Sequence, residues 1–418
     1  MTKFWEHSTS DEHHTESLLW LPKGQLLQNL GDQVNPVSQL VNALEVREKR
    51  VRVYTDLSHC GPCEEVSSNM LEDRDVVSVI NANWNLLTPE EQRRRFGARV
   101  GVIEPVKTIQ EADVCILPKV WNYYLRSDKV GLAVAFARRA AEFGKEVVVW
   151  NGGDLEAVVP IPNAVTFFHG PHRSLKRAYR KTFAIPQFKE DWLQIYYQGK
   201  EQPRPWKPIP SVGFCGLASS WNCRTLARGV YTKLHHAYHK AGFARYVPPS
   251  LPPPVLLRMK ILRRLAAESR LQTNFIIRDR YRGGIQGADT TNSQAKAKLE
   301  FVGNIWENDY TVCVRGVGNF SARFYETLCL GRIPIFVNTD CVLPYDFKFN
   351  YKDYCVWIEE DEIGQLPQRL LDFHSRLSPV AFLDLQHRCR QLWEDYLSVD
   401  GFYRHFAEHF GHNIFSLS

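Results

Sequence analysis

The chain has 418 residues, of which 44% are apolar and 23% are charged, a balance typical of folded proteins and not of disordered chains. Its 52 basic and 46 acidic residues give a formal charge of +6 without a polybasic block, so nucleic-acid binding is not indicated, whereas a polyanionic substrate such as a diphosphate is compatible with it. The length exceeds one ordinary core, so we expect two domains with a cleft between them.

The first twenty residues mix acidic side chains with histidines and do not have the basic start and apolar stretch of a secretory signal. The longest apolar runs, such as 130–137, fall short of the ~20 residues that span a bilayer. Ten irregularly spaced cysteines then indicate reduced thiols, and Cys115, Cys215 and Cys313 lie in apolar runs where cysteine acts as a small hydrophobe. We therefore expect a cytoplasmic protein, and peripheral attachment at the inner face of the membrane stays open.

The first half alternates short apolar runs with helical patterns. This alternation favours a parallel sheet with helices on both faces, a doubly wound α/β domain. An amphipathic helix is expected over 129–143. The expected strands are 50–54, 114–117, 146–150 and 165–168.

Four prolines between Gln202 and Pro210 favour an extended, stiff path, and we place the domain boundary there. A second proline cluster, 248–254, predicts a loop inside the second domain, and apolar residues at helical spacing over 379–410 predict one or two closing helices. The expected strands of the second half are 211–216, 274–277, 310–314 and 333–337.

The most informative segment is 309–337, which has the pattern strand, glycine turn, helix, glycine stop, strand. Gly316 and Gly318 permit a tight turn, and Asn319 or Ser321 can cap the helix that follows. A glycine turn that leads into a helix leaves unpaired N–H groups and the positive end of the helix dipole at one place. The segment therefore predicts a phosphate site, although a Gly-x-Gly-x-x-Ser turn departs from the dinucleotide fingerprint at its third glycine.

Three charged side chains surround this turn. Arg315 and Arg323 flank it, and Glu326 lies on the same helix face as Arg323, about one turn (~5 Å) further from the helix start. A carboxylate at that distance from a bound diphosphate can accept hydrogen bonds from the two hydroxyls of a ribose. The pattern thus fits a nucleoside diphosphate.

These residues resemble the exostosin family of glycosyltransferases. The resemblance rests on Arg-Gly-x-Gly-x-Phe-Ser-x-Arg-x-Tyr-Glu over 315–326, followed by Gly-Arg-Ile-Pro at 331–334 and Leu-Pro-Tyr at 343–345. It extends upstream to Phe-Ile-Ile-Arg at 275–278 and to 211–216. Weaker similarity covers the elements at 51–57 and 112–118, so that about 360 residues are included.

The resemblance implies a GT-B architecture: two Rossmann-like, doubly wound α/β domains that face a cleft. It implies transfer from a nucleotide-sugar donor, with uridine diphosphate expected, to a glycan or lipid-linked acceptor, with inversion and without an essential metal or other cofactor. Arg315 and Arg323 would hold the diphosphate, the turn from Gly316 through Gly318 and Asn319 to Ser321 would cradle it, Glu326 would bind the ribose, and Arg278 would face the same cleft. The expected divisions are a tail over 1–30, an acceptor-side domain over 31–205, a donor domain over 206–385 and closing helices over 386–418.

A general base must deprotonate the acceptor hydroxyl, and it should come from the N-terminal domain across the cleft. Asp56 and His59 follow the first strand, and His169 and His172 follow the strand at 165–168, so all four lie where α/β folds place ligands. Asp56 and His169 are carried forward as candidates, and the choice stays open. Arg173, Lys176 and Arg177 fit an acidic acceptor, although a surface helix face is the alternative for them.

Two other motifs compete with this interpretation. Cys60-Gly-Pro-Cys63 after a strand is the thioredoxin arrangement, but it is embedded in a much larger α/β pattern. Asp73-Arg-Asp75 resembles the metal-binding Asp-x-Asp of the other main glycosyltransferase fold, but it follows a charged helical pattern and not an apolar strand. The alternative to a transferase is a non-catalytic nucleotide- or glycan-binding subunit of a polysaccharide-synthesising complex, because a donor site without a working base has the same sequence.

Overall fold

The computed structural model describes residues 50–59, 88, 90–91, 102–176, 181–220, 223–243, 245–278 and 290–410. By its contacts the chain divides into residues 1–47 and 48–418, and all described residues belong to the second unit. The predictions for the tail over 1–30, for Cys60 and Cys63, for Asp73 and Asp75 and for Arg177 lie outside the described residues.

The first half forms a parallel sheet in the order β2-β1-β3-β4-β5-β6. The four predicted strands are all present. Two further strands, β2 and β6, were missed, because their residues Ile-Glu-Pro and Thr-Phe-Ala do not form an apolar run. The strands are β1 (Val51–Tyr54), β2 (Ile103–Pro105), β3 (Val114–Ile116), β4 (Val147–Trp150), β5 (Ala164–Phe168) and β6 (Thr182–Ala184).

Helices cover both faces of this sheet, which is why every residue of β3 and β4 is buried. On one face, α6 (Val130–Glu142) buries Ala133, Phe136, Ala137 and Ala140, the helical spacing of one apolar stripe. These α6 side chains share a core with α5 (Trp121–Arg126) and with Cys115. Burial raises the pKa of the Cys115 thiol to about 11. The predicted helix over 129–143 is thus confirmed to within a residue at each end.

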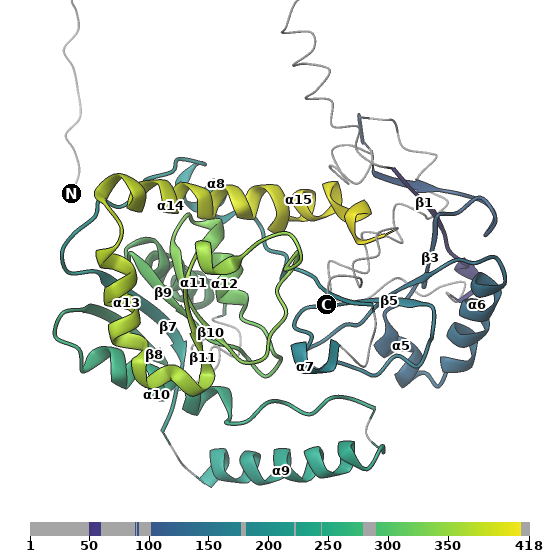
Figure 1. Cartoon of the computed structure of the whole chain (residues 1–418), viewed down its shortest axis with the longest axis horizontal. Coiled ribbons are helices and arrows are strands. Elements are labelled where there is room, and N and C mark those ends of the chain that lie inside the picture. The colour runs from purple at the N-terminus through teal and green to yellow at the C-terminus, as the bar shows by residue number, and fades with distance from the viewer. Residues whose placement is uncertain are drawn as a thin grey trace, which may run out of the picture. The chain divides into compact units, whose positions relative to one another are not determined.

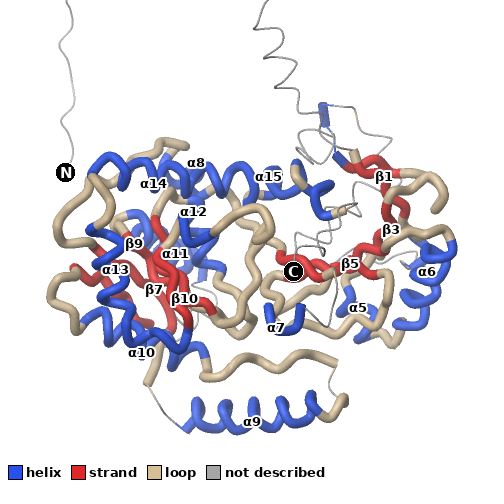
Figure 2. Tube along the Cα trace, viewed as in Figure 1, coloured by secondary structure: helices blue, strands red, loops and turns tan. Residues whose placement is uncertain are grey.

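The second half forms another parallel sheet, in the order β11-β10-β9-β7-β8. Relative to the chain this is the order of the first sheet without its last strand, so both are doubly wound, as predicted. Figure 2 shows the strands in two groups, each bordered by helices. β11, which ends in Glu359, was not predicted. The strands are β7 (Ser211–Leu217), β8 (Gln272–Arg278), β9 (Tyr310–Cys313), β10 (Ile333–Asn338) and β11 (Val356–Glu359).

Apart from the helix Cys223–Lys240, the helices of the second half pack on a single large core, which includes the thiols of Cys313 and Cys329. Burial raises the pKa of both thiols to about 12, so they act as the small hydrophobes that the sequence predicts. The helices are α8 (Trp192–Tyr197), α9 (Cys223–Lys240), α10 (Pro254–Ala266), α11 (Thr290–Trp306), α12 (Ala322–Cys329), α13 (Leu366–Ser375) and α14 (Pro379–Leu392) (Figure 1).

The end of the described chain returns to the first sheet. After α14, a π-helical turn (Trp393–Leu397) leads to α15 (Val399–Arg404). Phe402 and Phe406 then pack against Trp150 and Phe167 of β4 and β5. The predicted closing helices are therefore present, and they begin at Pro379, before the expected boundary at residue 386.

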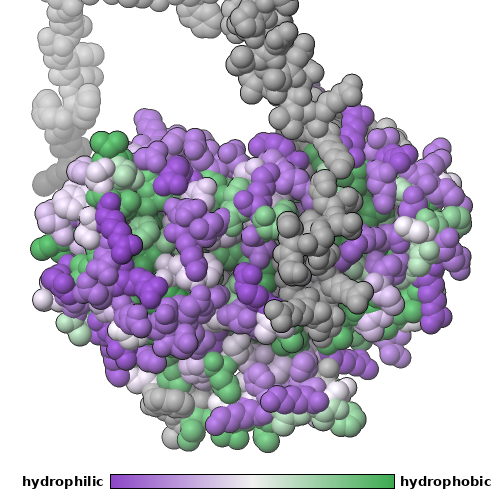
Figure 3. Space-filling model, in the orientation of Figure 1, coloured by the Kyte–Doolittle hydropathy of each residue, from purple (hydrophilic) through white to green (hydrophobic). Residues whose placement is uncertain are grey.

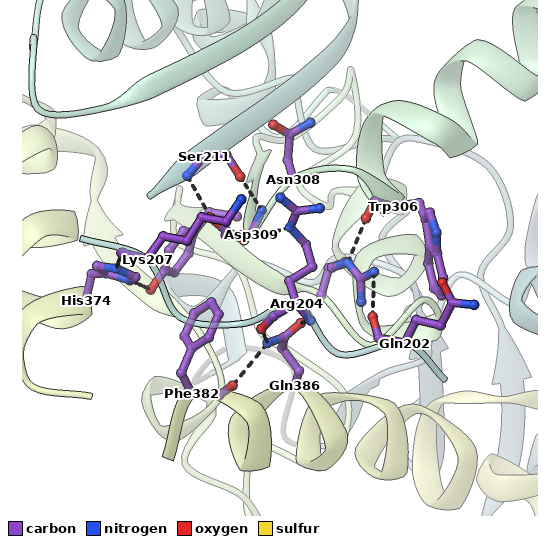
Figure 4. Close-up of polar contacts among 12 residues, drawn as sticks. Gln202, Arg204, Lys207, Ser211, Trp306, Asn308, Asp309, His374, Phe382 and Gln386 are labelled. Carbon is purple, nitrogen blue, oxygen red and sulfur yellow. Dashed lines mark hydrogen bonds and ion pairs between the residues drawn. The ribbon is translucent and has the colours of Figure 1, made fainter. Parts of the chain in front are cut away.

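The proline-rich segment 202–210 lies against the amino-terminal edge of the second sheet (Figure 4). The Arg204 guanidinium donates to Oδ1 of Asp309 at 2.7 Å, and the Arg204 backbone and the Gln386 side chain exchange hydrogen bonds of 2.8 and 2.9 Å. The carbonyl of Gln202 accepts from Arg332 at 3.1 Å. The segment is extended, as predicted, and these contacts attach it to the second sheet.

Candidate functional site

The predicted phosphate segment follows β9 at the carboxyl edge of the second sheet. β7 pairs with both β8 and β9, so the strand order reverses between β7 and β9. Ligands of doubly wound folds bind at such a reversal point, where two connections leave in opposite directions. The loop from Val314 to Ser321 therefore occupies the position that favours ligand binding.

The glycine turn is closed in this structure. The N–H of Gly316 donates to the carbonyl of Phe320 at 2.9 Å, and the ring of Phe320 lies 5.3 Å, centroid to centroid, from that of His169. A Cβ on Gly318 would meet the backbone oxygen of Asp154, and one on Gly170 would meet the carbonyl of Asn319 at 2.5 Å. The turn thus packs closely against segments that follow β4 and β5.

The Arg315 guanidinium binds backbone of its own chain. It donates to the carbonyls of Ser250 and Pro252 at 2.9 and 2.5 Å, inside the predicted proline loop. The Arg315 side chain is among the largest that are fully buried, and burial lowers its pKa. Arg258 in turn donates to the Arg315 carbonyl at 2.8 Å and to the Leu217 carbonyl at 3.2 Å, so it joins the two loops at the reversal point.

Arg323 is likewise held by protein groups. Its guanidinium donates to the carbonyls of Cys215 and Val312 at 2.6 and 3.3 Å and lies 4.4 Å from the centre of the Phe214 ring. Both arginines expected to hold a diphosphate are therefore occupied by carbonyl oxygens here. Arg278, at the end of β8, pairs with Glu300 at 2.6 Å.

Besides Nε of Arg315, two donors of the loop have no protein partner. Ser321 is the N-cap residue of α12, yet its hydroxyl makes no capping bond, and Oγ is buried without a hydrogen bond. The amide oxygen of Asn319 accepts from Thr339 at 2.8 Å, which leaves its buried Nδ2 unsatisfied. Buried donors without acceptors are rare and costly, which makes this pair a candidate for an external anion.

Glu326 lies in the second turn of α12 and is only 7% exposed. No hydrogen bond or ion pair to its carboxylate is found in the described part of the chain. Burial raises its pKa, and the positive charges of Lys189, Arg323 and Lys298 oppose that effect. Glu326 and Arg323 therefore do not pair directly, and a buried carboxylate remains with its acceptor capacity unused.

The two candidate bases after β1 are bound locally. Asp56 accepts hydrogen bonds from the Ser58 hydroxyl and N–H at 2.6 and 3.1 Å. Burial acts to raise the pKa of Asp56, but these bonds together with the charges of His59 and Arg139 hold the pKa below its ordinary value. His59 is buried with Nδ1 3.0 Å from the Tyr124 hydroxyl, and burial lowers its pKa.

The candidate bases after β5 lie beside the loop. His169 contacts Phe320 as described, and Nδ1 of His172 lies 3.1 Å from a carboxylate oxygen of Glu156. The other ring nitrogen, Nε2, is 3.3 Å from the Ser250 hydroxyl. Glu156 is buried, and no sequence pattern indicated it, because nothing local connects a residue after β4 with a histidine after β5.

A cavity of about 820 Å³ opens beside His172. It lies at the carboxyl ends of β10 and β11 and is also lined by α9. Thr339, in its wall, is the residue that donates to Asn319, which connects the cavity with the loop. Basic and acidic side chains line different segments of the wall, among them His172, His236, Lys240, Asp340, Glu359 and Asp361.

Asp340 joins segments from the two halves at this cavity. Its carboxylate accepts from the N–H and the hydroxyl of Ser174 at 3.1 and 2.6 Å, and its backbone carbonyl accepts from the N–H of Arg173 at 2.7 Å. The Arg173 guanidinium reaches Asp346 at 3.3 Å. Arg173 is therefore engaged within the protein, at the start of the short helix α7 (Arg173–Lys176).

Over the described ranges, no cluster of three or more histidine, cysteine or acidic side chains has the arrangement of a metal site. Within the same residues, no helix combines the length and the hydrophobicity needed to cross a bilayer.

Comparisons with known proteins give matches among solved structures alone. No protein family's sequence profile and no curated protein matches the chain. A glycosyltransferase from Rickettsia africae ESF-5 aligns at 15% identity over 88% of this chain and 100% of its own, with a TM-score of 0.33. The pneumococcal O-GlcNAc transferase GtfA, in complex with UDP and GlcNAc, aligns at 11% identity over 71% and 56%, with a TM-score of 0.29. Likeness at these scores does not bear on the fold or the function of this chain.

Proposed function

We propose that this chain is a glycosyltransferase that moves a sugar from a nucleoside diphosphate donor, with uridine diphosphate as the nucleotide, to a hydroxyl of a glycan or lipid-linked acceptor. The observation that carries the proposal is the connection from β9 to α12. Ser321 and Asn319 there hold buried donors without a protein acceptor, and Glu326, one turn further, holds a buried carboxylate without a donor. A nucleoside diphosphate supplies the complement of both.

In this proposal the phosphates bind at the start of α12. The hydroxyl of Ser321 and the amide of Asn319 donate to phosphate oxygens, and the positive end of the helix dipole adds to the attraction. Arg315 and Arg323 hold the loop in shape through backbone carbonyls and add positive charge behind it. Charge fixed in advance stabilises the negative charge that develops on the leaving diphosphate, so no metal is required.

Glu326 binds the ribose. A buried carboxylate is costly unless it accepts hydrogen bonds, and two adjacent ribose hydroxyls provide them. Burial raises the pKa of Glu326, and the charges of Lys189, Arg323 and Lys298 oppose that rise. In this proposal the carboxylate accepts from the ribose in its ionised form.

His172 acts as the general base. With Nδ1 protonated toward the Glu156 carboxylate, Nε2 is left as the proton acceptor and faces the Ser250 hydroxyl at the cavity wall. Nε2 takes the proton of the acceptor hydroxyl as its oxygen bonds to the anomeric carbon, while the bond from that carbon to the diphosphate oxygen breaks. A single displacement of this kind inverts the anomeric configuration.

The alternative is a non-catalytic nucleotide- or glycan-binding subunit. It is favoured by one observation, which is that the guanidinium groups of Arg315 and Arg323 are both used by the protein itself. Such a subunit would bind the nucleotide and release no product.

The test combines binding and turnover on the full chain. We expect calorimetry to detect UDP binding, and mass spectrometry to detect UDP release from at least one member of a UDP-sugar panel with mixed glycan acceptors. His172→Asn should abolish release while UDP binding stays unchanged, and Glu156→Gln should shift the pH profile of turnover. The control is Ser375→Ala, a serine outside the site, which should behave as wild type.

Three outcomes are distinguishable. Binding with turnover that depends on His172 supports the transferase. Binding without turnover against every donor and acceptor supports the non-catalytic subunit. Absence of UDP binding at millimolar concentration overturns both.

A further inference from the structure

Helix α9 (Cys223–Lys240) presents an apolar face to solvent. Leu226, Val230, Leu234 and Tyr238 follow one another at intervals of four residues, which places them along one side of the helix. Each of them is more than half exposed, as is Tyr231 beside them. Figure 3 shows hydrophobic side chains at the lower edge of this face of the molecule, where Figure 1 places α9.

The opposite side of α9 is polar and faces the protein. Thr232 is buried, and Nε2 of His236 lies 3.1 Å from the Pro249 carbonyl. Lys233, His236, His239 and Lys240 line the cavity described above. A helix on the surface of a soluble protein normally has the reverse orientation, with its apolar stripe toward the core. The orientation of α9 therefore leaves an apolar stripe exposed to solvent, which a binding partner could bury.

The charge of the helix indicates the chemistry of that partner. The eighteen residues of α9 include two arginines, two lysines and three histidines but no aspartate or glutamate. A second copy of the same helix would add the same basic composition and no counter-charge, which disfavours self-association. A partner with an apolar interior and a negatively charged surface complements both the apolar stripe and the positive charge of α9.

We propose that α9 is a membrane-docking helix that lies in the interfacial plane of a bilayer containing anionic phospholipid. Interfacial helices combine an apolar face of leucine and aromatic residues with basic residues that contact lipid phosphates. The exposed aromatic rings of Tyr231, Tyr238 and Phe243 are of the type that gathers at the level of lipid headgroups. The inference does not depend on the proposed transferase activity.

The experiment is co-sedimentation of the full chain with vesicles. Wild type should pellet with vesicles of phosphatidylcholine mixed with phosphatidylglycerol, remain in the supernatant with phosphatidylcholine alone, and lose binding as salt is raised. Leu234→Glu should reduce the bound fraction about tenfold, because it places a negative charge in the centre of the stripe. The matched control is Val380→Glu on α14, where an apolar side chain is 77% exposed, and it should bind as wild type.

Three results would overturn the proposal. One is failure of wild type to pellet with anionic vesicles. Another is equal pelleting of Leu234→Glu and wild type, which would place membrane contact elsewhere in the chain. A third is a dimer in solution that Leu234→Glu dissociates while vesicle binding is absent, which would make the stripe an interface between copies. Circular dichroism confirms that both variants are folded, and UDP binding gives an independent readout, since neither position belongs to the proposed site.

Discussion

Asp309 and Ser211 bind each other in both directions: the N–H of Ser211 donates to Oδ2 of Asp309 at 2.8 Å, and the N–H of Asp309 donates to the Ser211 hydroxyl at 2.9 Å (Figure 4). These residues precede and begin two neighbouring strands, β9 and β7, so the exchange fixes the register of the strands whose opposite ends hold the candidate site. Asp309 also accepts from Arg204 and is 1% exposed.

Asp309→Ala should destabilise the fold strongly. It leaves the Arg204 guanidinium and the Ser211 N–H without their acceptor, and removal of one partner from a buried ion pair costs about 3–5 kcal/mol. Ser211→Ala, which removes one neutral hydrogen bond, should cost only about 1 kcal/mol. Urea unfolding measures both, with the exposed Asp353→Ala as a control expected within about 0.5 kcal/mol of wild type. Equal effects of the three substitutions would show that the exchange contributes little.

Glu326→Gln should separate stability from binding. Because the carboxylate is buried without a partner, its neutral amide should leave the unfolding free energy unchanged or raised. Binding of UDP should fall about 10- to 100-fold, since hydrogen bonds to a charged group contribute about 1.5–3 kcal/mol. Wild type should also discriminate UDP from its 2′,3′-dideoxy analogue, and the variant should not. Retained discrimination in the variant would remove Glu326 from the ribose site.

Gly318 and Gly316 form a matched pair within one turn. Gly318→Ala places a methyl group against the Asp154 backbone and 2.7 Å from the Phe320 ring, so the loop must shift, and overpacking of this kind costs about 1–3 kcal/mol. Gly316→Ala meets nothing within 4 Å and should stay within about 0.5 kcal/mol of wild type. Thermal unfolding compares them. A larger loss at Gly316 would mean that the turn has a different conformation in solution.

His409 should make stability depend on pH. It is enclosed by aromatic rings, including those of Tyr345 and Phe183, and burial lowers its pKa to about 4 from the ordinary 6.5. The unfolded chain therefore binds a proton that the folded one does not, so stability falls as the pH drops below 6.5 and the loss is complete near pH 4. The full effect is of the order of 3 kcal/mol.

Urea unfolding between pH 7.5 and 5 tests this prediction. His409→Phe should reduce the dependence in that window, to which the lowered pKa values of His59 and His405 also contribute. His387→Phe, at an exposed site with a raised pKa, should not reduce the fall. A wild-type stability that does not change over this range would contradict the assignment of a neutral buried imidazole.

The residue pattern alone located most of the local structure. Strands β4, β9 and β10, the helix α6 and the sequence of strand, glycine turn and helix around Gly316 were predicted close to their observed bounds. Hydrophobic periodicity, glycine turns and helix caps are properties of neighbouring residues, so they can be read without knowledge of the fold. β2, β6 and β11 were missed because they are short or polar at one end, and packing against a neighbouring strand is what holds them extended.

The residue pattern thus indicated a doubly wound first sheet, a second sheet, and a loop that carries Arg315, Ser321, Arg323 and Glu326 between a strand and a helix of the second half. The strand order of the structure places that loop at a reversal point. Which of these side chains remain available for a ligand depends on contacts between distant parts of the chain. Arg315 donates to a loop 65 residues away and Arg323 to a strand 108 residues away, whereas Ser321 and Glu326 keep unused hydrogen-bonding capacity. The pairing of His172 with Glu156 and the outward orientation of the apolar side of α9 were decided in the same way. The physical reason is that the partner of a polar group is set by the segments that folding brings beside it. Periodicity along the chain does not predict such long-range contacts.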